Sequence, residues 1–228
     1  MGYNRGKNFM DSLAYKSAAT KVFYSVLAYS IFNVLSTICS AIFYEPETLA
    51  KSLVETGSFP SSFYALMVLP LITAACCIYN AVTLKGFEKV LDEQDASSAK
   101  KLRVSAILSV VASLISALMI LMFCLNENYL TIIMLVGIFA IFAGVLGLTA
   151  FIFGLIGYIK LKNSETFPGA KGAKLVFIAT IIGIVGAVIG AFVSIVSEVV
   201  AIAVVVMTVI GWIQIKNAEV AETEAITE

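Results

Sequence analysis

The side chains that most often perform chemistry in proteins are sparse in this sequence. None of its 228 residues is histidine, which excludes imidazole as a general base and as a ligand of zinc or haem. Neither a phosphate-binding loop of the form G-x-x-x-x-G-K-[ST] nor a G-x-S-x-G nucleophile elbow occurs. We therefore expect no catalytic residue, no metal site and no cofactor, and we predict that the protein is not an enzyme.

The four cysteines are the remaining candidates for redox chemistry. Cys76 and Cys77 are adjacent within one apolar stretch, where we interpret them as core residues rather than a redox pair. Cys39 and Cys124 lie toward the outer ends of two other apolar stretches. A disulfide between them stays an open alternative, because the sequence does not fix the distance between the two residues.

Polar groups within long apolar stretches are the second class of candidates. Ionisable residues inside a membrane are usually functional, and Glu198 is the only acidic residue in the last such stretch. Asn33 lies at the middle of the first stretch, and we take it as the candidate polar intramembrane residue. A buried amide needs a hydrogen-bond partner, so we interpret Asn33 as an interhelical hydrogen-bonding residue. A permeation path along Asn33 is the alternative.

The elements that must position these residues are strongly apolar. Hydrophobic residues make up 60% of the chain and charged residues 13%, with a mean hydropathy of +0.98. Soluble domains are nearer half apolar and a quarter charged. Fifteen Lys and Arg balance fifteen Asp and Glu, so no basic field for nucleic acid exists. This composition excludes a disordered chain and a nucleic-acid binder, and it predicts an integral membrane protein.

Apolar stretches of spanning length predict the fold. A membrane-spanning helix takes about 20 residues, and the qualifying stretches are 22–43, 63–84, 104–125, 130–159 and 175–215. As one helix the last would be ~61 Å long, twice the ~30 Å of the bilayer core. We therefore predict a turn at Glu198 between helices 175–196 and 199–215, with one long bent helix as the alternative. The expected fold class is all-α, a polytopic transmembrane bundle of six spans.

The basic residues predict the orientation, because Lys and Arg concentrate in cytoplasmic loops. With six spans, every Lys and Arg except Lys51 falls on the same side of the membrane as both termini. We therefore expect a multi-pass protein of the cell membrane with cytoplasmic N- and C-termini. The predicted organisation is a cytoplasmic segment 1–21, a transmembrane domain 22–215 and an acidic cytoplasmic tail 216–228.

Glycines form stripes along two of the predicted helices. The helix-packing candidates are Gly137, Gly144, Gly147, Gly154, Gly183, Gly186 and Gly190. Small residues let helix backbones approach closely, and the short connection at Pro168 and Gly169 makes helices 130–159 and 175–196 neighbours. We expect the two stripes to face each other. A stripe that lines a pore or docks a partner protein is the alternative.

Three predicted helices end in similar sequences, with a shared pattern of Leu/Ile-Lys-x-x-Glu. The three segments are 80–88, 157–165 and 211–219, and an Ala-Lys pair at 99–100 and at 173–174 precedes two of the following helices. We interpret this pattern as an internal repeat, a duplicated hairpin that turns on the basic side. The alternative is that any helix can end at a membrane interface with a lysine and a solvated carboxylate.

The segment from about 135 to 190 has a sequence pattern that is similar to one found in other membrane proteins. It reads GLIGYIKLKNSE, a short Gly/Lys turn, and then GAKLVFIATIIGIVGAVIG. This pattern resembles the Gly-rich two-helix unit of small bacterial integral membrane proteins of unknown function. The resemblance implies a bacterial plasma membrane, and it supplies no catalytic residue. We predict a non-enzymatic protein that acts through helix packing with itself or a membrane partner, with a channel or small-solute transporter as the alternative.

Overall fold

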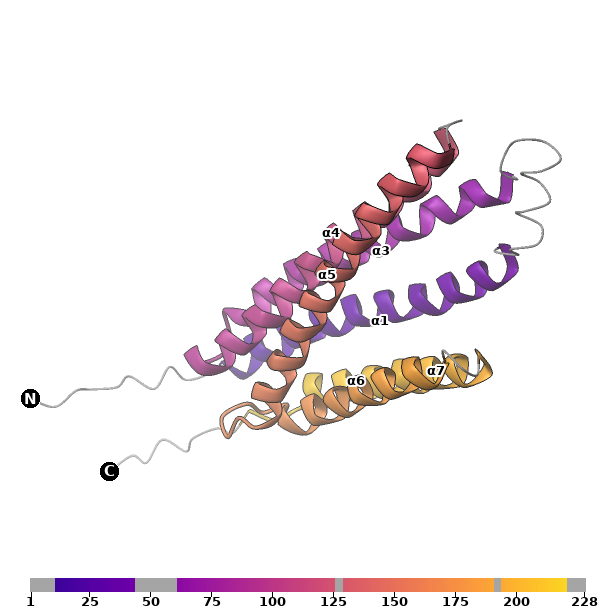
Figure 1. Ribbon diagram of the computed structural model, residues 1–228. Coiled ribbons are helices and arrows are strands. Elements are labelled where there is room, and N and C mark those ends of the chain that lie inside the picture. The colour runs from indigo at the N-terminus through magenta and orange to yellow at the C-terminus, as the bar shows by residue number, and fades with distance from the viewer. Residues whose placement is uncertain (1–10, 44–60, 126–128, 191–193, 221–228) are drawn as a thin grey trace, which may run out of the picture. The chain divides into compact units, whose positions relative to one another are not determined.

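The computed structural model describes residues 11–43, 61–125, 129–190 and 194–220, and the regular elements in these ranges are helices (Figure 1). They are α1 (Ser12–Phe43), α3 (Ser61–Glu88), α4 (Glu93–Leu125), α5 (Tyr129–Lys162), α6 (Ala170–Gly190) and α7 (Ser194–Lys216). Within the described residues five helices, α1, α3, α4, α5 and α7, are long and apolar enough to cross a bilayer. The all-α class and the six helices are therefore confirmed.

Several helices extend beyond their apolar stretches at the end that carries the lysines, which we call the basic end. Helix α1 begins at Ser12, where the Asp11 carboxylate accepts the N–H of Leu13 at 2.9 Å. Helix α4 begins at Glu93, where the Asp92 carboxylate accepts the N–H of Asp95 at 2.8 Å. An aspartate before the first turn satisfies N–H groups that have no partner inside the helix. Hydrophobicity alone therefore places these starts too late.

The division of the last apolar stretch is confirmed, but the predicted turn at Glu198 is wrong. Helix α6 ends at Gly190, before the predicted end at 196, and α7 begins at Ser194, before the predicted start at 199. Glu198 thus lies inside α7, one turn from its start. Glycine is a poor helix former and favours helix ends, whereas a carboxylate near a helix N-terminus is favoured by the helix dipole. The charge therefore did not require a turn.

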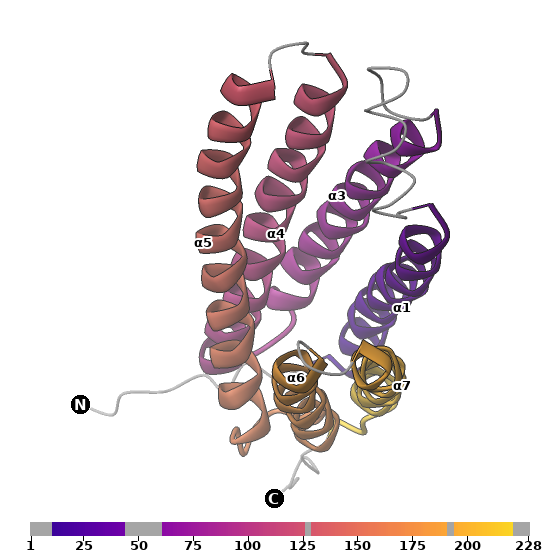
Figure 2. The same cartoon turned by 45° about the vertical axis from the view of Figure 1, so that its right-hand side comes forward.

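The chain divides into two compact units, which are described separately. The first contains Met1–Tyr24, Val82–Leu102 and Leu155–Glu228, and the second contains Ser25–Ala81 and Arg103–Gly154. Within the first unit, α6 and α7 lie side by side as an antiparallel pair (Figures 1 and 2). This pairing rules out the alternative of one long bent helix.

Burial is concentrated in the first unit, at the basic end. Its large side chains with less than 2% exposure include Tyr15, Phe87, Leu161, Trp212 and Ile215. In the second unit, by contrast, α5 leaves Ile141 70% exposed and Phe142 60% exposed. Apolar side chains in contact with lipid carry no penalty, so such exposure is what a membrane-spanning helix requires. The side chains that define the fold most tightly therefore lie at the basic end.

Candidate functional site

Four aromatic rings form the centre of the first unit, and we call them the aromatic core: Tyr15, Phe87, Phe167 and Trp212. Tyr15 lies 5.7 Å from Phe87 and 6.4 Å from Phe167, measured between ring centroids. Phe87 lies 6.2 Å from Phe167 and 6.1 Å from Trp212. These separations and the tilted or edge-on geometries are those that attract aromatic pairs. The core joins the start of α1, the end of α3, the α5–α6 connection and the end of α7.

Two hydrogen bonds satisfy the polar atoms of the aromatic core. The Tyr15 hydroxyl donates to the backbone carbonyl of Ile215 at 3.0 Å. The Trp212 indole N–H donates to the Tyr158 hydroxyl at 3.1 Å. Buried tyrosine and tryptophan normally need such partners, and both bonds run between segments distant in the sequence. The core is therefore a tertiary clamp rather than a local feature.

A buried carboxylate lies beside this core. Asp95, in the first turn of α4, is 1% exposed, and its Oδ2 accepts a hydrogen bond of 3.1 Å from the Thr166 hydroxyl. Its Oδ1 is buried and has no hydrogen-bond partner among the described residues. Burial of a carboxylate is costly, and the N-terminal turn of a helix offsets part of that cost. Asp95 ties the start of α4 to the α5–α6 connection.

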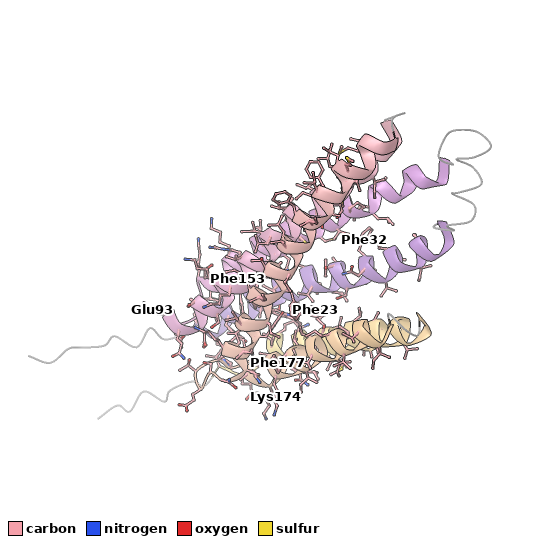
Figure 3. The ribbon with its side chains drawn as sticks, in the orientation of Figure 1. Phe23, Phe32, Glu93, Phe153, Lys174 and Phe177 are labelled. Atoms are coloured by element: carbon pink, nitrogen blue, oxygen red, sulfur yellow. The ribbon has the colours of Figure 1, made fainter. Side chains whose placement is uncertain are left out.

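The lysines of the basic end have two kinds of surroundings. The Lys162 ammonium lies 3.9 Å from the ring centre of Phe177, and the Lys216 ammonium lies 4.5 Å from that of Phe23. Figure 3 labels both phenylalanines, on α6 and α1 respectively. These are cation–π contacts, which favour a charged group at a partly desolvated site. A third lysine of the basic end, Lys101, instead lies near another lysine, Lys160.

The α6 glycine stripe faces α7, so the prediction that it faces α5 is wrong. A Cβ atom built on Gly186 would lie 2.7 Å from the Val200 Cβ, and one on Gly183 would lie 3.5 Å from Val204. Residues 191–193 alone separate α6 from α7, which makes this hairpin the closer partner. The surroundings of Gly190 lie outside the described residues.

The α5 stripe divides into two parts. A Cβ atom on Gly154 would lie 3.1 Å from the Ser105 hydroxyl of α4. At Gly137, Gly144 and Gly147, nothing lies within 4 Å of such an atom in the described part of the chain. The stripe therefore contacts α4 at Gly154, whereas its part from Gly137 to Gly147 is open among the described residues.

The backbones of α6 and α7 also approach closely at two glycines that the sequence analysis did not select. A Cβ atom on Gly211 of α7 would lie 2.8 Å from the Gly172 carbonyl oxygen, and one on Gly172 would lie 2.9 Å from the Ile215 amide nitrogen. Gly172 precedes Gly183 by eleven residues, about three helical turns, so it shares the face of the α6 stripe. That spacing is the signal that could have identified it.

The contacts favour a different repeating unit from the predicted one. Gly157 of α5 lies against Leu102 and the Ser98 carbonyl of α4, and the aligned Gly211 lies against Val176 and the Gly172 carbonyl of α6. Each aligned residue therefore contacts the helix that precedes it.

The first helical pair fits the same scheme. Asn80, which aligns with Gly157 and Gly211, accepts a hydrogen bond of 3.1 Å from Ser25 of α1. The aligned leucine and isoleucine positions, Leu84, Leu161 and Ile215, are each no more than 2% exposed. The repeating unit supported by these contacts is the hairpin α1–α3, α4–α5 or α6–α7, which starts and ends at the basic end.

The polar residues of α1 lie partly as expected. The Asn33 side chain is half-buried and hydrogen-bonds with that of Tyr29, one turn earlier in the same helix. An interhelical bond of the expected kind does occur in α1, but at Ser25 and Asn80. Whether Asn33 itself joins two helices stays a prediction.

The cysteines form no recognisable centre in the described residues. Cys39, Cys76 and Cys77 have free thiols, and Cys77 is buried as a core residue would be. The side chain of Cys124 lies outside the described residues. No group of three His, Cys, Asp or Glu side chains in the described part of the chain is placed to hold a metal ion.

Known proteins give no guide to this chain. No family model, no curated protein and no solved structure matches it. The resemblance of residues 135–190 to small bacterial membrane proteins therefore stays a prediction.

Proposed function

We propose that the protein is a non-enzymatic membrane protein that acts by helix packing, with itself or with another membrane protein. The observation that carries the proposal is the open half of the α5 stripe. Around Gly137, Gly144 and Gly147 the described chain leaves space within 4 Å of each missing side chain, whereas Gly186 and Gly211 are tightly packed.

Such a face suits association within a bilayer. Lipid tails are as apolar as leucine, so helices associate there through close backbone contact and weak hydrogen bonds. The open stripe from Gly137 to Gly147 runs along about 15 Å of α5. Exposed larger side chains border it, among them Ile141, Val145 and Leu148. The result is a shallow backbone-lined face onto which another helix fits.

Cysteine crosslinking in native membranes tests this proposal. In a variant without the natural cysteines, we expect Gly144→Cys to form a crosslinked dimer or an adduct with a single membrane partner. Phe142→Cys is the matched control, because Phe142 is also exposed but lies about 200° around the helix from Gly144. The absence of a crosslink at Gly144, or equal crosslinking at Phe142, would contradict the proposal.

The channel or transporter alternative needs polar groups that are available to a solute. Ser25 is fully buried and uses its hydroxyl on Asn80, and Asn33 contacts Tyr29. These pairings support a structural role for the polar residues of α1. The transporter is therefore the second candidate function. Measurements of solute flux with Asn33 variants distinguish it from helix packing.

We also propose that the basic end and both termini face the cytoplasm of a bacterial plasma membrane. Lysines end α3, α5 and α7, and Lys171 and Lys174 begin α6. The positive-inside rule then supports a cytoplasmic position for all of these ends.

A further inference from the structure

A chain of hydrogen bonds connects the buried carboxylate of Asp95 to the surface of the α5–α6 connection. The Thr166 hydroxyl donates to Asp95 Oδ2 at 3.1 Å, and Ser164 Oγ lies 3.1 Å from Thr166 Oγ1. Ser164 Oγ also accepts the backbone N–H groups of Thr166 at 3.3 Å and of Phe167 at 3.2 Å. Asp95 is 1% exposed, whereas Thr166 is exposed. The chain therefore gives protons from water a route to the carboxylate without unfolding.

This chain holds Asp95 in place but leaves its charge only partly satisfied. Asp95 is the third residue of α4, a position from which an acidic side chain can accept the N–H of the residue before the helix. Its Oδ1 makes no such bond and has no hydrogen-bond partner among the described residues. Burial of an ionised carboxylate is costly, and the hydrogen bond at Oδ2 offsets part of that cost. The ionised form is therefore the less favourable one in this position.

The ionisable groups that act on Asp95 from the neighbouring elements do not neutralise it. Asp92, in the α3–α4 connection, accepts the backbone N–H of Asp95 at 2.8 Å and repels a charge on its carboxylate. Tyr15 of α1 interacts with Asp95 electrostatically, but it donates its hydroxyl hydrogen to the Ile215 carbonyl at 3.0 Å. The α5–α6 connection contributes uncharged hydroxyls. Protonation of Asp95 therefore removes an unfavourable charge.

The direction of the pH dependence follows from these surroundings. Burial raises the pKa of the Asp95 carboxyl above its ordinary value, the hydroxyls of Ser164 and Thr166 offset part of the rise, and the Asp92 charge adds to it. Asp95 precedes the apolar stretch 104–125, so it titrates outside the membrane-spanning segment. With the pKa raised in the folded state, the stability from the neutral form is complete below the unfolded pKa and is lost as the pH rises through the folded pKa.

We propose that Asp95 and Thr166 form a pH-sensitive latch, which holds the α5–α6 connection against the start of α4 in acid and releases it as the pH rises. In the protonated form, Oδ2 carries the proton and donates to Thr166 Oγ1, and the Thr166 hydroxyl donates to water. When the carboxyl loses this proton to water, Thr166 becomes the donor and Oδ1 is left as part of a buried charge. Water reaches Oδ1 only if the connection moves away, so ionisation favours the open form.

Hydrogen–deuterium exchange of the full chain in detergent, measured over residues 163–169, tests the latch. The wild type and Asp95→Asn are compared at about pH 4 and at about pH 8, always at equal pH because the intrinsic exchange rate depends on pH. Asparagine reproduces the neutral carboxyl, since its amide donates to Thr166 and carries no charge. We expect similar exchange in acid and faster exchange of the wild type at the higher pH, by up to about tenfold for each unit by which the pKa of Asp95 is raised. Equal exchange at the higher pH would overturn the latch.

Two variants of Thr166 distinguish the latch from a contact that is only structural. Thr166→Ser keeps the hydroxyl and should keep the pH-dependent exchange of the wild type. Thr166→Val removes the hydroxyl, so the connection should exchange rapidly at both pH values, whereas in Asp95→Asn it should be protected at both. A connection in Thr166→Val that is still protected in acid and released at the higher pH would overturn the role of this hydroxyl.

Thermal unfolding gives a second, independent readout. The melting temperature of Asp95→Asn should be close to that of the wild type at about pH 4 and above it at about pH 8. Glu165→Gln is the matched control, because it removes an exposed carboxylate from the same connection and should follow the wild type at both pH values. An Asp95→Asn protein without this gain, or a Glu165→Gln protein with an equal gain, would overturn the proposal. Neither result bears on the association of α5, because Gly144 crosslinking is independent of Asp95.

Discussion

Gly186 is a position where adding a single methyl group should be costly. A Cβ atom there would lie 2.7 Å from the Val200 Cβ and closer still to a Val200 methyl group. Carbon atoms in contact prefer 3.5–4.0 Å, and a β-branched valine on a helix has little rotamer freedom with which to move away. Either α7 must shift away from α6, or Val200 must adopt a strained rotamer.

The expected magnitude follows from overpacking. Inserting one methylene into a packed interior costs typically 1–3 kcal/mol, so we expect Gly186→Ala to destabilise by about 2 kcal/mol despite the better helix propensity of alanine. Gly144→Ala is the matched control, because nothing lies within 4 Å of its Cβ position. It should be neutral or stabilise by up to about 1 kcal/mol.

Denaturant unfolding in detergent, followed by the fluorescence of Trp212, measures both changes. Trp212 is the one tryptophan of the chain and is 1% exposed in α7, so it reports on the loss of the aromatic core. Val200→Ala should rescue part of the cost of Gly186→Ala, because it removes the two clashing methyl groups but keeps the Val200 Cβ. A Gly186→Ala protein as stable as the wild type, or no rescue by Val200→Ala, would refute the contact between these two helix faces.

Three further tests, with four substitutions, address other parts of the structure. Thr166→Val should lower the stability by about 1–3 kcal/mol, because a buried oxygen of Asp95 loses its donor; a similar loss in an Asp95→Ala background would show that the hydrogen bond is not the cause. Asn33→Leu should change stability by less than about 1 kcal/mol, since hydrogen bonds within membranes average about 0.6 kcal/mol; solute flux into liposomes that stops with this change would favour the transporter. For orientation, Lys89→Cys should be labelled by an impermeant maleimide only after the cells are opened, and Glu127→Cys should be labelled in intact cells, so the reverse pattern would invert the topology.

The helices themselves were predictable because their cause is local. Each apolar stretch must satisfy its backbone inside the segment when it enters lipid, and length and composition are enough to identify it. The ends of the helices depend on single capping side chains, such as Asp11 and Asp92. The same dependence explains the misplaced turn, because the charge of Glu198 was given more weight than the glycine at 190.

The contacts of the basic end were not predictable from spacing. Asp95 and Thr166 are 71 residues apart in the sequence, and no periodic pattern joins them. The glycine at 172 was missed because one glycine near a helix start is ordinary until its partner at 211 is known. Stripes of small residues indicate that a helix will approach closely, but the choice of neighbour follows from the tertiary arrangement of connections and larger side chains.

The hydrogen bond from Tyr15 to Ile215 has a consequence for how the protein is made. Its two ends are 200 residues apart, so at about 5–20 residues per second roughly 10–40 s of synthesis separate them. Until α7 emerges, the rings of Tyr15, Phe87 and Phe167 lack Trp212, the partner of Phe87. Completion of the aromatic core therefore coincides with completion of the last helix, and a chain that stops before α7 leaves the other rings uncovered for chaperones and proteases to recognise.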